Sequence, residues 1–392
     1  MRVGEENQAM VHAFVNLAGV GSSAEFRLGM RQLAGMLPSV RWIVGNSPSF
    51  EAFWRQSRDL APRLDGQVLL LHTPLVFLGR DCLEKLLAGL ADSGAPAVLP
   101  VDPRTWQGEG LLDYATLRGF DGFVERLARP GRRLLPYDGH SPLLQLVPAS
   151  RLRQAAKRHE EWDSVLAPPA EALLVSDAFV HPYADYYGNN RAEVLELVPH
   201  GTARLLDVGG GEGGFAALAR ERLACEAHVA ELNPDAAAKA AMVVDRVWQG
   251  DFLELPIEAR FDCITMLDVL EHATDPGAML CRASELLTPA GVIVAAIPNL
   301  GHWSVVLDLL EGRWDYVPAG IACWTHLRFF TRRTMEQFFR LSGLCVERVV
   351  TVPMPAPPEV REALDRGGEG PFLPDWESLD AYAYHLVARR AV

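Results

Sequence analysis

The chain has 392 residues and a mass of 43.1 kDa, which at about 100–200 residues per domain predicts two or three domains. Hydrophobic residues make up 49% and charged residues 22%, which excludes a disordered or fibrous chain. The net charge of -13 argues against a nucleic-acid partner, which would need a basic footprint. No apolar run is long enough to span a membrane, and the six cysteines form no CxxC pair, so we expect a cytoplasmic protein with reduced thiols and no metal site.

The N-terminal half has an α/β pattern. Residues 67–71 predict a buried strand, residues 82–91 an amphipathic helix and residues 97–101 a second strand. Residues 66–101 resemble the centre of GT-A-type glycosyltransferases, in which an apolar strand ends in a metal-binding DxD motif. Here that place holds His72-Thr73-Pro74, and no DxD occurs in residues 1–180. The N-terminal half is therefore predicted to be a degenerate relative of these glycosyltransferases that binds a substrate or a partner. An unrelated α/β domain remains the alternative.

The character of the sequence changes between residues 150 and 185. A charged helical stretch at 151–162 is followed by Pro168-Pro169 and by His181-Pro182. We expect an N-terminal domain over 1–165, a linker over 166–184 and a second domain over 185–392.

The second domain shows strands that alternate with helices, the pattern of a parallel sheet. Two terminal strands without a crossover helix predict an antiparallel pair at the sheet edge. The predicted strands are 204–208, 226–231, 261–267, 291–297, 344–352 and 380–389, and the predicted helices include 275–287 and 334–342.

A glycine-rich turn follows the first of these strands, in the segment LLDVGGGEGGF over 205–215. Glycine lets a ligand approach the backbone closely, and the start of the next helix offers free N–H donors. Dinucleotide enzymes use a similar loop, so the loop alone leaves the ligand open.

Three acidic positions narrow the choice of ligand. Asp207 precedes the glycines and suits a cationic amino-acid end rather than a diphosphate. Glu231 ends the next strand, 20 residues after Gly211, where it can accept hydrogen bonds from a ribose diol. Asp251 beside Phe252 suits an adenine amino group and ring. A diol, a purine and an amino-acid end together describe S-adenosylmethionine.

These motifs, with ELNP, FDCITMLDVLEHATDP and LLTPAGVIVAAIPN, resemble those of class I S-adenosylmethionine-dependent methyltransferases over about residues 180–392. Within this family, the sequence most resembles the branch that contains the ubiquinone- and methionine-biosynthesis enzymes. The resemblance implies a Rossmann-like seven-stranded sheet with an antiparallel edge strand, preceded by the separate N-terminal domain. It also implies S-adenosyl-L-methionine as cofactor, held by Arg191, Asp207, Gly209, Gly211, Glu231, Asp251, Phe252 and Leu267.

Candidate bases for the acceptor follow the fourth and fifth strands, where open α/β sheets place their ligands. They are Asp268, Glu271, His272 and His302, with His326 further along. We expect His302 and His326 to be catalytic, and loss of His302 as base to lower turnover by about 10²–10⁴-fold. Glu271 and His272 are interpreted as mainly structural.

The predicted activity is methyl transfer to a hydroxyl or amine of a small-molecule or glycosylated acceptor in a biosynthetic pathway. A sugar or natural-product intermediate is the expected partner, and the chain is predicted to form a homodimer. Two alternatives stay open: a bifunctional glycosyltransferase–methyltransferase, and an idle cofactor-binding scaffold. The scaffold alternative arises because segment 320–326 lacks an acidic residue that similar sequences carry.

Overall fold

A computed structural model gives the structure of the chain and divides it into two compact units. The N-terminal unit holds Met1–Tyr114 and Gly119–Tyr183, and the C-terminal unit holds Ala115–Arg118 and Ala184–Val392. The structure describes residues 10–16, 33–35, 37, 39–45, 50–72, 76–79, 81–102, 116–129, 131–139, 142–160, 165, 167–182, 190–317, 320–367 and 374–391.

The N-terminal unit is built on a mixed sheet. Along the sheet the strands follow the order β2-β1-β3-β7-β5-β8-β4, and β6 pairs with β8. Strands β1, β2 and β3 are parallel, whereas β7 runs antiparallel to both β3 and β5. The strands are β1 (Val11–Asn16), β2 (Arg41–Gly45), β3 (Gln67–Leu71), β4 (Val76–Leu78), β5 (Val98–Val101), β6 (Leu134–Pro136), β7 (Leu144–Pro148) and β8 (Leu173–Pro182).

Helices pack on this sheet through apolar stripes. In α3, Leu83, Leu86 and Leu90 lie on one face and are buried against the strands, as their spacing predicts. The helices of the unit are α2 (Phe50–Ser57), the 3-10 helix η1 (Arg58–Arg63), α3 (Cys82–Ser93), α4 (Leu117–Ala128) and α5 (Ala149–Arg158).

The boundary between the domains differs from the prediction. Residues 173–182, expected within a linker, form β8, which pairs parallel with β5 and antiparallel with β4 and β6. The apolar run over 172–180 is a strand whose side chains, such as Val175 and Val180, are buried in the core of this unit. Of the predicted His72-Thr73-Pro74 site, Thr73 and Pro74 lie outside the described residues.

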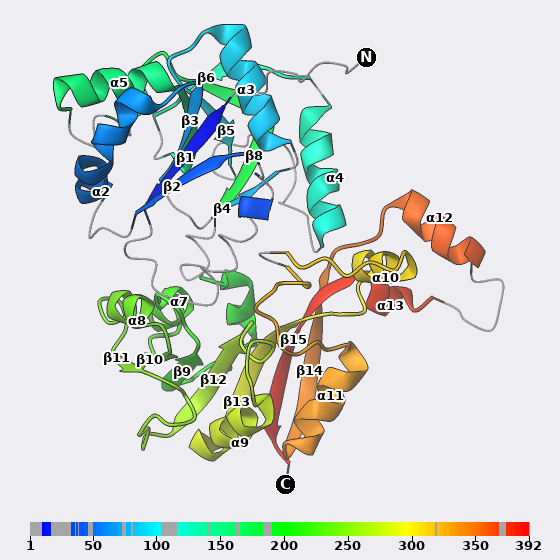
Figure 1. Cartoon of the computed structure of the whole chain (residues 1–392). Coiled ribbons are helices and arrows are strands. Elements are labelled where there is room, and N and C mark those ends of the chain that lie inside the picture. Colours follow the sequence, from blue (N-terminus) through cyan, green and yellow to red (C-terminus); the bar gives the residue numbers. More distant parts are fainter. Residues whose placement is uncertain are drawn as a thin grey trace. The chain divides into compact units, whose positions relative to one another are not determined.

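The C-terminal unit contains a seven-stranded sheet of order β11-β10-β9-β12-β13-β15-β14 (Figure 1). The first five strands are mutually parallel, and β15 runs antiparallel to both of its neighbours. The strands are β9 (Arg204–Val208), β10 (Glu226–Glu231), β11 (Arg246–Gln249), β12 (Phe261–Leu267), β13 (Leu287–Pro298), β14 (Leu344–Pro353) and β15 (Ala381–Arg390).

Helices cover both faces of this sheet, so its central strands are apolar on both sides. On β9, Leu206 belongs to the cluster that packs under α9 and α11, whereas Leu205 belongs to the opposite cluster, under α7. The helices are the 3-10 helix η2 (Ala192–Leu197), α7 (Gly214–Leu223), α8 (Pro234–Ala240), α9 (Pro276–Leu286), α10 (Trp303–Leu310), α11 (Arg332–Leu341), α12 (Pro358–Gly367) and α13 (Trp376–Leu379).

The predicted sheet is confirmed, including the antiparallel pair at its edge. The strands expected at 204–208, 226–231 and 261–267 have those bounds in the structure. Within the antiparallel pair the reversed strand is β15, second from the edge, and β14 lies at the edge itself.

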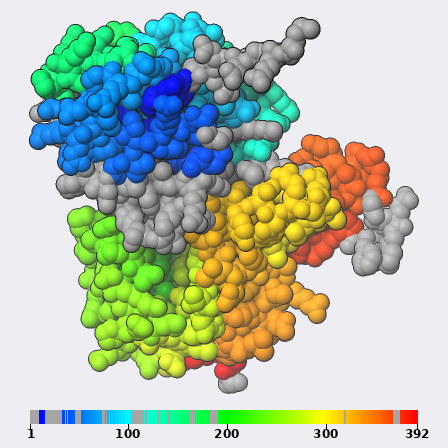
Figure 2. Space-filling view, viewed as in Figure 1, coloured from blue at the N-terminus to red at the C-terminus, as the bar shows by residue number. Residues whose placement is uncertain are grey.

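The surface of the C-terminal unit includes α10, the yellow segment in Figure 2. Leu309 and Leu310 at the end of this helix are 52% and 69% exposed. Among the residues that the structure describes, no helix is both long enough and apolar enough to cross a membrane.

Candidate active site

The glycine loop joins β9 to α7 with a left-handed backbone. Gly209, Gly211 and Gly213 have φ of 70°, 56° and 83°, values that L side chains rarely adopt. A Cβ added to Gly209 would lie 2.7 Å from a methyl group of Val269. Both the dihedral angle and the available space therefore require glycine at the first position of the loop.

Glu231, at the carboxyl end of β10, holds this loop. Its Oε2 accepts a hydrogen bond from the Gly211 N–H at 2.9 Å, and its Oε1 accepts one from the Asn233 N–H at 2.7 Å. The side chain is 6% exposed. The 20-residue spacing read from the sequence thus corresponds to a direct contact between the acid and the loop.

A cavity of about 320 Å³ lies beside the loop at the carboxyl ends of β9, β10 and β11. Four of the residues predicted to bind the cofactor line it: Gly209, Glu231, Asp251 and Phe252. Asp251 is exposed, and its Oδ1 accepts the Leu253 N–H at 2.9 Å. Residues that sequence reasoning missed also line it, namely Val269, Thr274, Asp275 and Met279.

Replacing Glu231 with alanine is expected to weaken cofactor binding by about 1.5–3 kcal/mol, because a charged acceptor of ribose hydroxyls and the anchor of the loop are both lost. Calorimetric titration with S-adenosylhomocysteine measures the change. Glu226→Ala, at the exposed start of the same strand, is the matched control and should bind normally. An unchanged dissociation constant for Glu231→Ala would place the ribose elsewhere.

Asp207 lies beneath the loop and lines neither this cavity nor the second cavity described below. It is 3% exposed, and its Oδ1 accepts the Thr265 hydroxyl at 2.6 Å. Burial raises the pKa of this carboxyl to about 7. A Cβ on Gly210 would lie 2.8 Å from Asp207 Oδ2, so the carboxyl supports the loop from below. The expectation that Asp207 contacts the cationic end of the ligand is therefore corrected. Its carboxyl instead supports the glycine loop.

A second cavity, of about 330 Å³, adjoins the first because His272 lines both. Arg191 lines it, forms an ion pair with Asp268, and donates to His385 Nε2 at 3.2 Å. Arg191 and Asp268 have φ of 42° and 55°. Two paired non-glycine residues in the left-handed region are the kind of local strain that functional sites retain.

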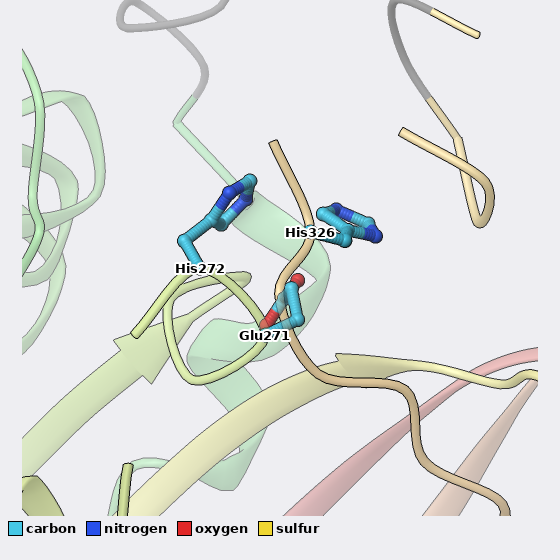
Figure 3. Close-up of side chains that lie close together, drawn as sticks. All are labelled: Glu271, His272 and His326. Atoms are coloured by element: carbon cyan, nitrogen blue, oxygen red, sulfur yellow. The ribbon is translucent and has the colours of Figure 1, made fainter. Parts of the chain in front are cut away.

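Three residues that line this second cavity, Glu271, His272 and His326, have side chains that lie close together (Figure 3). The Glu271 carbonyl oxygen accepts the N–H groups of Leu327 and Arg328 at 2.7 and 3.0 Å, which holds the His326 segment against the turn after β12. His326 is thus a lining residue of the second cavity, and its catalytic role stays a prediction. Glu271 and His272, expected to be structural, also belong to its lining.

His302 lies elsewhere and lines neither cavity. It is fully buried as the N-cap of α10, with Nδ1 2.8 Å from Ser304 Oγ and Nε2 3.0 Å from the Met354 carbonyl. A carbonyl accepts only, so Nε2 carries the hydrogen. Burial lowers the pKa of the imidazole to about 4. The expectation that His302 faces the transferring methyl as a base is therefore wrong, because packing turned both nitrogens toward the protein.

Replacing His302 with alanine is expected to lower the free energy of unfolding by about 1–3 kcal/mol, through loss of a helix cap and of a buried hydrogen bond. Turnover per folded molecule should stay within about three-fold. Urea unfolding and activity assays on the same preparation measure both quantities. A loss of turnover above 100-fold in a stably folded variant would restore the base assignment.

The remaining expected residues take other positions. Leu267 ends β12 and packs on the apolar cluster beneath α7, and neither cavity is lined by it. The aromatic residues near 314–330 pack on one another, with the Trp314 and Phe329 ring centroids 5.1 Å apart. His385 and Tyr382 of β15 line the second cavity and were missed. The sequence does contain a signal for this position, because His385 is a histidine within an otherwise apolar strand.

A sheet with this strand order, a glycine loop after β9 and an acid at the end of β10 defines the class I S-adenosylmethionine-dependent methyltransferases. A family model described as a methyltransferase domain matches residues 179–349. The ubiquinone biosynthesis O-methyltransferase of Rhodopseudomonas palustris (strain TIE-1) is 30% identical over 231 residues, covering 54% of this chain and 86% of that protein. The enzyme of the same name from Cereibacter sphaeroides (strain KD131 / KCTC 12085) is 28% identical over 156 residues, covering 38% of this chain and 62% of that protein.

Solved structures give a weaker likeness. The 1,6-didemethyltoxoflavin-N1-methyltransferase of Burkholderia thailandensis is 18% identical with a TM-score of 0.37, covering 53% of this chain and 82% of that one. The mitomycin 7-O-methyltransferase is 19% identical with a TM-score of 0.35, covering 51% of this chain and 53% of that one. Because of the family model and the sequence relatives, the chain is assigned to the S-adenosylmethionine-dependent methyltransferase family. S-adenosylmethionine is its cofactor.

Proposed function

We propose that this protein transfers a methyl group to a hydroxyl of a small-molecule acceptor bound in the second cavity. The observation that carries the proposal is the shared wall at His272, which puts the glycine-loop cavity and the second cavity side by side. The cofactor supplies an activated methyl group, so the protein mainly has to place the acceptor in line with it.

In this proposal the residues of the first cavity hold the nucleoside part of the cofactor. Glu231 accepts the ribose hydroxyls, and Asp251 and Phe252 contact the adenine. Arg191 then takes the carboxylate of the methionine part, which requires its ion pair with Asp268 to loosen. The 42% exposure of the Asp268 side chain supports this exchange, because solvent can replace the pair.

A hydroxyl acceptor is favoured over an amine because the second cavity offers groups that can deal with a proton. Burial lowers the pKa of His272 and lowers that of His326 to about 4, so both imidazoles are neutral near pH 7. A neutral imidazole can accept a hydrogen bond or a proton from a hydroxyl, whereas an amine acceptor only needs to be neutral itself. The relatives named as O-methyltransferases support the same choice.

The proposal extends to the identity of the acceptor, the role of the N-terminal unit, the oligomeric state and the location. A sugar or natural-product intermediate in a biosynthetic pathway is the proposed acceptor, the N-terminal unit is proposed to bind that acceptor or a partner, and the chain is proposed to act as a homodimer. The six cysteines are thiols rather than disulfides, which supports a reducing, cytoplasmic location. The bifunctional and idle-scaffold alternatives are not favoured by the methyltransferase relatives.

A direct assay tests the activity. The full chain is incubated with isotopically labelled S-adenosylmethionine and matched panels of phenols, sugar alcohols and amines, and products are detected by mass spectrometry. We expect methyl ethers from at least one hydroxyl series. Methylation confined to amines would overturn the acceptor class, and cofactor binding without any product would favour the scaffold.

A further inference from the structure

The group formed by Glu271, His272 and His326 contains the donor atoms of a metal site. One ring nitrogen of each histidine and a carboxylate oxygen of Glu271 lie within 4.8 Å of one another. The residues come from two segments, the turn after β12 and the stretch before α11, which meet at the second cavity (Figure 3). Among the described residues, this is the one group of at least three His, Cys, Asp or Glu side chains with such spacing.

Glu271 lacks the partners that a buried carboxyl normally has. The residue is 1% exposed, and within the described part of the chain neither of its carboxyl oxygens has a hydrogen-bond partner. Leaving such a group unsatisfied costs free energy, and buried polar groups without a protein partner often mark the place of a bound ion.

Both histidines have a backbone carbonyl beside one ring nitrogen, as histidines that bind metals often do. His272 Nδ1 lies 3.2 Å from the Thr325 carbonyl, and His326 Nδ1 lies 2.9 Å from the Ile321 carbonyl. Because a carbonyl only accepts, each Nδ1 carries the hydrogen and each Nε2 carries the lone pair. Histidines that bind metals commonly donate their second nitrogen to a backbone carbonyl in this way, which sets both the tautomer and the ring orientation.

We propose that Glu271, His272 and His326 bind one divalent cation of the zinc type, with a coordination position open to the second cavity. Two imidazole nitrogens and one carboxylate match the donor set of catalytic zinc sites. Magnesium and calcium prefer ligand sets made of oxygen, so this site should select against them. Metal binding also supplies the positive partner that the Glu271 carboxylate lacks.

The cation has a consequence for the acceptor, and this step, unlike cation binding, rests on the proposed O-methyl transfer. A hydroxyl bound at the open position has a lowered pKa and gives its proton to water. The new O–C bond then forms as the S–C bond breaks, and no group changes its oxidation state. The sequence predicted no metal site because His272 and His326 are 54 positions apart and no short motif contains all three ligands.

Metal binding is measured on the full chain after removal of ions with a chelator. Zinc is titrated calorimetrically, and cobalt is added in a second experiment to follow its visible absorption. The test variants are Glu271→Gln and His326→Ala; the matched controls are Glu285→Gln and His200→Ala, at exposed positions. Thermal unfolding and S-adenosylhomocysteine binding verify that each variant is folded.

We expect one zinc ion per wild-type and control chain, and affinity at least about 100-fold weaker in both test variants, since losing a ligand costs more than losing an outer partner. No saturable binding at one equivalent, or unchanged affinity in Glu271→Gln, would overturn the site. If His326→Ala does not fold, Glu271→Gln decides the result.

Methyl transfer is assayed separately with and without chelator. Transfer that persists in a chain that binds no zinc rejects the cation site and leaves the proposed function standing. Stoichiometric zinc binding without a methylated hydroxyl product keeps the site and rejects the function.

Discussion

Replacing His326 with alanine is expected to lower turnover by about 10²–10⁴-fold, the range for loss of a group that manages a proton in the transition state. The side chain lines the second cavity, and the Ile321 carbonyl fixes its Nδ1–H, so Nε2 presents the lone pair. Whether that lone pair contacts the hydroxyl directly or through a cation, its loss removes activation of the acceptor.

Cofactor affinity should change by less than about two-fold in the same variant, because His326 does not line the glycine-loop cavity and is not the residue proposed to hold the methionine carboxylate. Steady-state kinetics combined with calorimetry of S-adenosylhomocysteine separates the two effects, and His200→Ala is the control histidine. If turnover survives within a few-fold, positioning alone carries the reaction. If cofactor binding is lost as well, His326 supports the first cavity instead.

The pH dependence of stability is expected to change when Asp207 is replaced with asparagine. Burial raises the pKa of this carboxyl to about 7 in the folded state, above its ordinary value of 3.8. The folded chain therefore holds this proton more tightly than the unfolded chain does. The stabilisation of the folded state that comes from this bound proton is fully present below about pH 4 and is lost as the pH rises toward 7. Above pH 7, the wild type contains a buried carboxylate that the asparagine variant does not.

Unfolding by urea at a series of pH values measures this effect. The difference in unfolding free energy between wild type and Asp207→Asn should fall by about 1.4 kcal/mol per pH unit inside this window, on the order of 4 kcal/mol in total. Glu254→Gln, at an exposed position, controls for general charge effects and should show no such slope. A pH-independent difference would mean that Asp207 is ionised throughout the range.

Local sequence determined the elements that build the first cavity. The strands at 204–208 and 226–231 have their predicted bounds because each is a short run that is followed by turn residues and is buried on both faces. Once these strands are parallel neighbours, their carboxyl ends meet at one edge of the sheet. Glu231 then has to lie beside the glycine loop, so a spacing of 20 residues was sufficient to predict a contact.

Tertiary structure alone decided the second cavity. His302 and His326 both follow apolar stretches, and nothing in their neighbours says which one faces solvent. Packing buried His302 as a helix cap, whereas two hydrogen bonds to the Glu271 carbonyl brought His326 to His272. Residues 173–182 likewise became a strand because β5 offered an unpaired edge. Side-chain direction and contacts across more than 50 residues depend on the packing of the whole unit, which no local pattern of residues records.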